Sequence, residues 1–242
     1  MITRTHAFLL LLALSTGIAR AQGQGGLDVP DPSAVIEKKV EIPTQNLQAV
    51  LTRQGDLVVL TSNGRYVFRG EIYDAWSKKP LRSIDEIAES VSVIDLKKLD
   101  LNTADLNPLV YGAGARDVVV FVDPRCPWCG RLMAQIAGRP DLAKAYRFLL
   151  MPIPALGDDS SDPVRKLECA ADRAQALQAL MTESGIGGLP QRADCRLEPV
   201  QRRMASAYLM NVPGVPFLIA PDGRTHQGLP PDLDGFLAGG AL

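Results

Sequence analysis

The chain has 242 residues, of which 46% are hydrophobic and 22% are charged. This balance is typical of a globular protein with a packed core, and it excludes a disordered, collagen-like or coiled-coil chain. Lys and Arg total 26 against 27 for Asp and Glu, so no excess of positive charge favours nucleic-acid binding. Two histidines are too few for a histidine-rich metal site, and the chemistry to explain lies in four cysteines: Cys126, Cys129, Cys169 and Cys195.

Residues 1–21 have the pattern of a secretory signal peptide. A basic residue precedes an apolar run over residues 7–14, and residues 19–21 form a small-x-small cleavage site. The run is far shorter than the ~20 residues that cross a bilayer, and a short anchor or buried helix is the alternative. We therefore predict an exported chain that begins near Gln22, in an oxidising compartment where paired cysteines indicate disulfide chemistry first.

The next segment predicts a small sheet. Apolar runs at 57–60 and 66–68 flank Asn63-Gly64, which can adopt the positive φ angles of a type I′ turn, so we predict a hairpin. Residues 35–51, interrupted by a proline, predict a short helix or strand that leads into the sheet. A unit of about 55 residues buries little surface alone, so we expect it to pair with another copy or with the rest of the chain.

A helix and a linker are predicted next. Residues 83–99 carry apolar residues at helical spacing, with Ser83 as N-cap and Glu86 completing a capping box. Residues 102–115 collect Asn, Pro and Gly, which predicts a linker and not a packed element. The predicted organisation is a signal peptide at 1–21, an N-terminal domain at 22–80, a linker helix and linker at 81–115, and a second domain at 116–242.

The second domain begins with residues 117–122, a β-branched run typical of a strand buried on both faces of a mixed sheet. Composition and spacing then predict the remaining elements in chain order: a strand at 146–151, helices at 163–182 and 199–210, a strand at 215–220 that ends at the Asp222-Gly223 turn, and a helix at 231–238. This order is typical of an α/β thioredoxin-like domain with a helical insertion.

Cys126-Pro127-Trp128-Cys129 lies at the predicted junction of strand and helix, where a Cys-x-x-Cys motif is specific for dithiol redox chemistry. Sulfur atoms one turn apart share a helix edge and can close a small disulfide ring. The positive end of the helix favours the thiolate of Cys126, which we predict to be the attacking sulfur. Pro127 suits the first helical position, and Cys129 is predicted to be the less exposed, resolving thiol.

A structural disulfide or half of a zinc site is the alternative for this pair. The 39 residues between Cys129 and Cys169 and the 25 between Cys169 and Cys195 are poor spacing for zinc, so no metal is predicted. Cys169 and Cys195 are instead predicted to form a structural disulfide, one of the three pairings that four cysteines allow. Asp123 is interpreted as a capping or solvated loop residue, with proton transfer near Cys129 as the alternative, and Arg125 as a surface charge or a thiolate stabiliser.

Taken together, the chain after residue 21 resembles the DsbC/DsbG family of periplasmic disulfide isomerases. The turn and the Gly-x-x-Tyr-Asp sequence are similar to the family's dimerisation domain, the Phe-x-Asp-x-x-Cys-x-x-Cys sequence to its active-site strand and helix, the later cysteines to its structural pair, and Gly-Val-Pro to its cis-proline loop. The segments that carry the resemblance are 63–74, 121–129, Cys169 with Cys195, and Gly214-Val215-Pro216.

The resemblance implies an α/β thioredoxin-like domain with a helical insertion, preceded by a small α+β (cystatin-like) dimerisation domain and a linker helix. It implies a periplasmic homodimer with chaperone character, whose apolar cleft binds misfolded or partly folded exported proteins and whose dithiol is kept reduced by a membrane-bound thiol reductase. No cofactor and no nucleic acid are implied. Cys126 and Cys129 would be catalytic, and the residues that contact substrate would be Pro127, Trp128, Val215 and Pro216.

Two positions depart from the isomerase type within this resemblance. Pro127-Trp128 stands where the isomerases have Gly-Tyr, and Val215 stands where they have Thr. Both positions tune the redox potential, and both are similar to the oxidant branch. A dithiol oxidase that introduces disulfides, or a redox-independent chaperone or assembly module, is therefore an alternative function.

Overall fold

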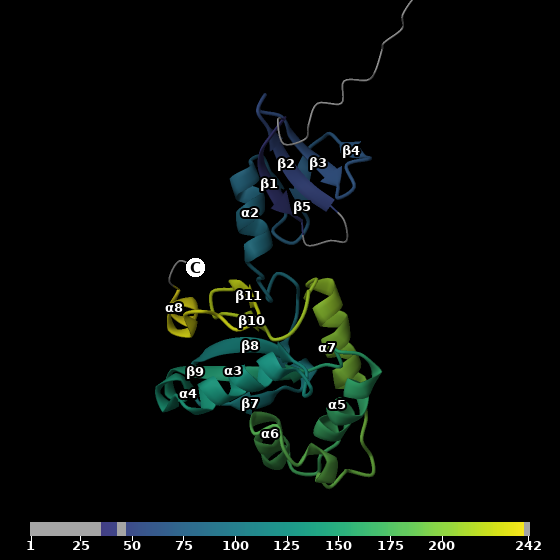
Figure 1. Cartoon of the computed structure of the whole chain (residues 1–242), viewed down its shortest axis with the longest axis vertical. Helices are drawn as coiled ribbons and strands as arrows, with labels where there is room; N and C mark the ends of the chain where they lie inside the picture. The colour runs from purple at the N-terminus through teal and green to yellow at the C-terminus, as the bar shows by residue number, and fades with distance from the viewer. Residues whose placement is uncertain (1–34, 43–46, 240–242) are drawn as a thin grey trace, which may run out of the picture.

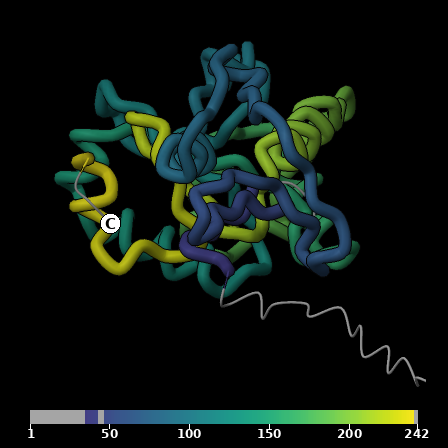
Figure 2. The backbone as a smooth tube through the Cα atoms, turned by 90° about the horizontal axis from the view of Figure 1, so that it is seen from above, coloured from purple at the N-terminus to yellow at the C-terminus, as the bar shows by residue number. Residues whose placement is uncertain are grey.

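The computed structural model describes residues 35–42 and 47–239 (Figure 1). The described residues up to Ser92 form an N-terminal unit, and residues 93–239 form a C-terminal domain; the two lie end to end along the long axis (Figure 1). Seen along that axis, the N-terminal unit lies in front of part of the C-terminal domain (Figure 2). The predicted signal peptide, residues 1–21, and the proline at position 43 lie outside the described residues. No helix in the described ranges is long and apolar enough to span a membrane.

The N-terminal unit is an antiparallel sheet covered by one helix. Its strands follow the order β1-β2-β3-β4: β1 (Ile36–Glu41), β2 (Leu47–Thr52), β3 (Leu57–Thr61) and β4 (Val67–Phe68). A separate ribbon of β5 (Ile72–Asp74) and β6 (Lys79–Leu81) leads into α2 (Ile84–Ser92). The small core consists of Ala49, Leu81, Ile84 and Ile87. Of the two alternatives predicted for residues 35–51, a short helix or a strand, the described residues form strands, β1 and β2.

The predicted hairpin is confirmed, but its turn type was wrong. β3 pairs antiparallel with β4, and of the two turn residues only Gly64 has a positive φ, at 69°. A type I′ turn would need Asn63 there as well. The Asn63 side chain instead accepts hydrogen bonds from Thr61 Oγ1 at 2.7 Å and from the Arg65 N–H at 3.1 Å. These bonds hold a turn in which only Gly64 has a positive φ.

Helix α2 begins as predicted and ends earlier than predicted. The Ser83 hydroxyl accepts from the Glu86 N–H at 3.1 Å, which caps the first turn. The helix ends at Ser92 and not at Leu99, because the chain turns to contact a distant part of the sequence. Val93 forms an extended bridge with Arg224, and the Ile94 N–H donates to the Gly223 carbonyl at 2.7 Å.

The C-terminal domain is built on a five-stranded sheet of order β11-β10-β8-β9-β7. The strands are β7 (Leu109–Tyr111), β8 (Arg116–Val122), β9 (Tyr146–Pro152), β10 (Phe217–Ile219) and β11 (Thr225–Gln227). β8 and β9 are parallel and the other pairs are antiparallel, so the sheet is mixed, as expected. Val118 and Val120 pack in one core cluster and Val119 and Phe121 in another, which confirms that β8 is buried on both faces.

Helices cover both faces of this sheet (Figure 1). One cluster takes in residues of α3 (Pro127–Ala137), α4 (Pro140–Ala145), α5 (Ser161–Glu168), α6 (Arg173–Met181) and α8 (Leu233–Ala238). The other takes in Ala207 of α7 (Glu198–Leu209) together with Met210. Short 3-10 turns lie at Thr103–Leu106, Asp158–Ser160 and Ile186–Gly188.

Two sequence predictions in this domain were wrong. The supposed linker at 102–115 contains β7, which pairs with β9 and places Leu109 at 2% exposure, because Asn, Pro and Gly mark turns but not the short strand between them. The single helix expected at 163–182 is broken into α5 and α6. The break occurs because Cys169 is held in a disulfide and Asp172 caps a new helix by accepting from the Ala174 N–H at 2.8 Å. The domain boundaries predicted at residues 80 and 115 remain a prediction.

Candidate active site

Cys126 lies where the sheet passes into the first helix of the domain. The buried run of β8 ends at Val122, a turn follows in which the Cys126 N–H donates to the Asp123 carbonyl at 3.0 Å, and α3 begins at Pro127. Cys126 is the N-cap and Pro127 occupies the first helical position, where its missing N–H leaves no bond unmade. The junction of strand and helix that the motif predicts is therefore present.

Both sulfur atoms of the motif are free thiols and both are buried. Cys126 is 4% exposed and Cys129 is 3% exposed, so the difference in exposure expected between them is absent. Each sulfur has its own backbone hydrogen-bond partner. The Cys126 thiol donates to the Val215 carbonyl at 3.5 Å, and Cys129 Sγ accepts from the Asp123 N–H at 3.5 Å.

The surroundings of Cys129 favour its neutral form. Burial raises the pKa of the Cys129 thiol well above its usual value, because a thiolate there would lose its solvation. The neighbouring Cys126 and the carboxylate of Asp123 raise this pKa further, and the hydrogen bond from the Asp123 N–H opposes them. Cys129 is thus held as a thiol, a poor nucleophile until its environment changes.

Asp123 fixes the turn that carries Cys126. Asp123 is 1% exposed, which overturns the interpretation as a solvated loop residue, and the N-cap of α3 is Cys126 and not Asp123, so the interpretation as a helix cap is also wrong. One carboxylate oxygen accepts from the Arg125 N–H and the Ser160 hydroxyl, both at 2.8 Å, and the other accepts from the Leu156 N–H at 2.9 Å. The turn before α3 is therefore tied to the loop after β9. The Arg125 side chain itself is exposed.

The loop before β10 faces the dithiol. The Val215–Pro216 peptide bond is cis, as the resemblance implies. The Pro216 carbonyl accepts from the Gly228 N–H at 2.7 Å, which ties this loop to the end of β11. The Gln227 side chain lies close to Gly214, because a Cβ at Gly214 would be 3.0 Å from Gln227 Nε2. The structure thus brings Val215 and Pro216 together with Cys126.

The two residues between the cysteines expose apolar surface. Trp128 is 54% exposed, Pro127 is also exposed, and the guanidinium of Arg131 stacks 4.4 Å from the centroid of the Trp128 ring. A small cavity of about 240 Å³ adjoins the loop at 212–215, and its other walls are the segment at 153–155 with Met204 and Ala207 of α7.

Sequence reasoning missed this small cavity. Residues 153–155 follow the buried strand β9, which runs parallel to β8, so the ends of both strands meet at the same edge of the sheet. Ligand sites in α/β sheets lie at that edge, and this was the signal that could have pointed to the segment.

The other two cysteines lie apart from this group. Cys169 ends α5 and Cys195 precedes α7, and they form a disulfide with Cα atoms 5.2 Å apart, which confirms the predicted pairing. It ties the helical insertion together. Among the described residues, no cluster of three or more His, Cys, Asp or Glu side chains is arranged to bind a metal ion.

Residues 109–234, more than half of the chain, match the family described as a Thioredoxin-like domain. The chain belongs to the thioredoxin-like domain family. The match begins at β7 and ends in α8, so it includes the dithiol, the loop with Pro216 and the helical insertion.

Curated relatives extend the likeness beyond this domain. The chain is 28% identical over 215 residues to the probable thiol:disulfide interchange protein DsbC of Bordetella avium, a match that covers 84% of this chain and 73% of the relative. It is 26% identical over 226 residues to the thiol:disulfide interchange protein DsbC of Dickeya dadantii, covering 92% and 88%. The resemblance to the DsbC/DsbG type is thereby confirmed. The crystal structure of a disulfide interchange protein from Neisseria gonorrhoeae is 26% identical, covers 57% of this chain and 97% of that chain, and has a TM-score of 0.47.

Proposed function

We propose that this protein is a periplasmic disulfide isomerase that acts on exported proteins through the dithiol of Cys126 and Cys129. The coarser assignment, a thiol-disulfide oxidoreductase of the DsbC type, rests on the family and the curated relatives. The observation that carries the proposal of a disulfide isomerase is the position of Cys126, at the N-terminus of α3 with its thiol hydrogen-bonded to the Val215 carbonyl.

The chemistry begins with the Cys126 thiolate, which attacks one sulfur of a substrate disulfide. A bond forms between Cys126 and that sulfur while the substrate bond breaks, and the released substrate thiolate takes up a proton. In isomerisation a substrate thiolate then attacks the mixed disulfide, which forms a new substrate disulfide and regenerates the Cys126 thiolate. No net electrons are transferred over this cycle.

The burial of Cys129 supports isomerisation over reduction. When Cys129 resolves the mixed disulfide, the substrate gains two electrons and the enzyme leaves as a disulfide, which a membrane-bound thiol reductase would have to reduce again. Because burial raises the pKa of Cys129, this thiol has to lose its proton before it can attack the mixed disulfide. The substrate's own thiol therefore has time to complete the exchange.

Export and assembly belong to the same proposal. The pattern of a signal peptide at residues 1–21 supports the periplasm as the location. The N-terminal sheet ends in the short edge strand β4, and Val67 and Phe68 of this strand, with Tyr66 just before it, are each more than half exposed. Exposed apolar residues on a sheet edge favour pairing with a second copy, which supports a homodimer.

The test is the refolding of a protein with scrambled disulfides by the reduced enzyme. We expect the wild type to restore native pairing, Cys126→Ser to abolish it, and Cys129→Ser to retain much of it, because only reduction needs the second thiol. Loss of isomerisation in Cys129→Ser to the level of Cys126→Ser would contradict the proposal. Activity that survives in the double variant would favour a redox-independent chaperone instead.

A second candidate function is a dithiol oxidase. It is favoured by Pro127 between the cysteines and by Val215 before Pro216, which differ from the residues of the isomerase type. Equilibration of the dithiol in glutathione buffers separates the two, since an oxidase has a markedly more oxidising couple than an isomerase.

A further inference from the structure

The carboxylate of Glu183 lies against the helix that carries the dithiol. A Cβ at Gly130, the residue after Cys129, would overlap the carboxyl carbon and both carboxylate oxygens of Glu183. The carboxylate therefore occupies the place that a side chain at position 130 would take. Gly130 belongs to α3 and Glu183 follows α6, and the two helices pack together in one core cluster through Leu132 and Leu180.

Neither residue is the one that its own helix favours. Glycine inside a helix loses more conformational freedom than any other residue, and Gly130 lies inside α3. Glu183 has a positive φ of 51° just after α6, where glycine is the usual residue. The Glu183 N–H donates to the Leu180 carbonyl at 3.3 Å, and this bond helps to close the end of α6. The absent side chain at position 130 leaves the space that the Glu183 carboxylate fills.

Position 130 lies one helical turn after Cys126. The Gly130 N–H donates to the Cys126 carbonyl at 3.1 Å, which is the hydrogen bond of an α-helical turn. Residues four positions apart share a face of a helix, and helical Cβ atoms point towards the N-terminus. The Glu183 carboxylate therefore lies on the face of α3 that begins with Cys126, on the order of 6 Å from the Cys126 Cβ.

The charged groups around the start of α3 leave this carboxylate without a neutralising partner. Arg125 and Arg131 are exposed, and the Arg131 guanidinium is stacked on the Trp128 ring. Within the described part of the chain, no basic side chain forms an ion pair with Glu183. Asp123, the other acid at the site, is buried and accepts hydrogen bonds from three donors. The charge of Glu183 is therefore the less compensated of the two.

We propose that Glu183 is a positioning residue of the dithiol, whose carboxylate opposes a negative charge on Cys126 Sγ and so favours the disulfide over the dithiol. Like charges about 6 Å apart repel each other, and solvent weakens the repulsion because Glu183 is exposed. Removal of the carboxylate makes the couple more oxidising. The inference rests on the proposed function, which uses the same dithiol, and it assigns the side chain that keeps the couple away from that of an oxidase.

The experiment equilibrates the protein with reduced and oxidised glutathione at pH 7 and low salt. Two molecules of reduced glutathione supply two electrons and two protons to the disulfide of Cys126 and Cys129, which yields the dithiol and one molecule of glutathione disulfide. Alkylation after an acid quench, followed by mass spectrometry, gives the reduced fraction. We expect Glu183→Gln to raise the equilibrium constant for reduction about threefold. Equal constants for the wild type and Glu183→Gln would overturn the inference.

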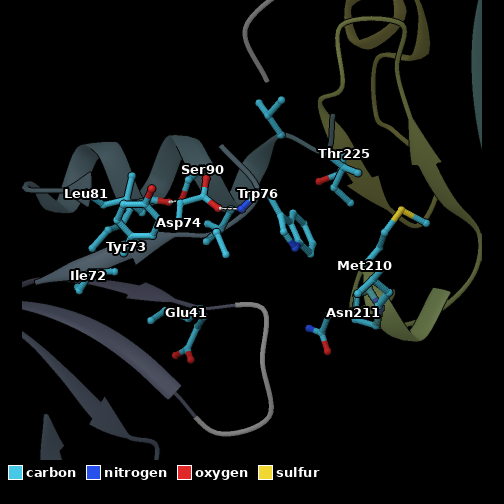
Figure 3. A pocket seen from close by; sticks show the side chains of 18 of the residues that line it. Glu41, Ile72, Tyr73, Asp74, Trp76, Leu81, Ser90, Met210, Asn211 and Thr225 are labelled. Atoms are coloured by element: carbon cyan, nitrogen blue, oxygen red, sulfur yellow. Dashed lines mark hydrogen bonds between the residues drawn. The ribbon is translucent and has the colours of Figure 1, made fainter. Parts of the chain in front are cut away.

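Glu41→Gln is the matched control, because it makes the same change at a carboxylate that does not contact α3. Glu41 lies on the wall of a cavity of about 760 Å³ between the N-terminal unit and the C-terminal domain (Figure 3). None of the described residues that line this cavity belongs to α3 or α6. We expect Glu41→Gln to leave the equilibrium constant unchanged. An equal rise in both variants would show an effect of net charge alone, which contradicts the inference.

Gly130→Ala tests the contact itself. The added methyl group takes the place of the Glu183 carboxylate, which is the end of a flexible side chain and moves away. We expect Gly130→Ala to raise the equilibrium constant as Glu183→Gln does, and to add nothing to it in the double variant. A further rise of the same size in the double variant would assign the effect to the methyl group and overturn the role of Glu183.

Salt separates an effect of charge from an effect of shape. Because about 1 M KCl shortens the screening length to about 3 Å, the constants of the wild type and Glu183→Gln should converge there. A difference that persists undiminished at this salt concentration would overturn the inference. A wild type that restores no native disulfides in a scrambled protein would overturn the proposed function instead. The equilibrium with glutathione needs no client protein, so it still decides the role of Glu183.

Discussion

Cys126 and Cys129 lie three positions apart and meet different surroundings. Cys126 contacts the carbonyl of a loop that binds substrate in the proposed mechanism, whereas Cys129 points inward and takes a hydrogen bond from Asp123. Of the two sulfurs, Cys126 is the one next to the loop with Val215, and Cys129 is the one held as a neutral thiol by the raised pKa. The Asp123 carboxylate holds this arrangement by accepting hydrogen bonds from two loops.

The raised pKa of Cys129 gives a pH dependence with a definite sign. Below about pH 8.5, the usual value, the thiol is protonated in the folded and unfolded states alike. Above it the unfolded chain loses the proton while the folded protein keeps it, so the stability contributed by this group falls as the pH rises. We expect the stability of Cys126→Ser in urea to decline between pH 8.5 and 10 more steeply than that of Cys126→Ser with Cys129→Ala.

Alkylation measures the same property directly. Iodoacetamide should modify Cys129 in folded Cys126→Ser only slowly at pH 9, and at an ordinary rate once the protein is unfolded in urea. Half-maximal reactivity near pH 8.5 in the folded protein would contradict the assignment.

At the scale of elements, α5 and α7 are joined by a buried ion pair. Arg203 donates to Glu168 at 2.8 Å, and both side chains are 1% exposed. Arg203 also donates to the Asn107 carbonyl at 3.2 Å, and Glu168 accepts from the Asn107 side chain at 2.6 Å. This group of side chains connects the helical insertion to the segment just before β7.

Removal of one partner would leave a buried charge without compensation. We expect Glu168→Ala to lower the free energy of unfolding by about 3–5 kcal/mol, measured by urea denaturation. Asp162→Ala, which breaks exposed pairs with Arg165 and Lys166 on α5, serves as the control and should change stability little. Equal losses of unfolding free energy in the two variants would show that the buried ion pair contributes no more to stability than an exposed one.

The elements that local signals define were predicted well. The β-branched run of β8, the Ser83 cap of α2 and the Cys-x-x-Cys at the start of α3 each depend on neighbouring residues. The errors arose where distant residues decide the outcome. Val93 leaves the helix because it pairs with Arg224. In the site, the positions of both cysteines were predictable, whereas the partners of Asp123 were not, because Leu156 and Ser160 come from another loop.

At the scale of the whole molecule, the exposed apolar side chains lie in both units. Val67 and Phe68 line the edge of the N-terminal sheet, and Trp128 lies beside the dithiol in the C-terminal domain. The proposed dimer uses the first group and leaves the second free for substrate.

We expect Phe68→Asp to convert the protein to a monomer, because a charge on the edge strand opposes pairing. The molar mass from light scattering measures this. Tyr208→Asp, which alters an aromatic side chain on α7 that is 83% exposed, is the matched control and should leave the mass unchanged. A dimeric Phe68→Asp would place the contact between copies elsewhere.

The path of the chain between the two units also determines how they can be separated for study. Ile94 and Leu106 precede residue 116, yet they pack against Val119 and Phe121 in the core of the C-terminal domain. A fragment cut at 116 would therefore lose one edge of the sheet and expose that core to water, and it would aggregate. A cut just before Ser92 keeps every one of these contacts. A soluble fragment with the dithiol therefore has to include residues 102–115, which the sequence predicted to be a linker.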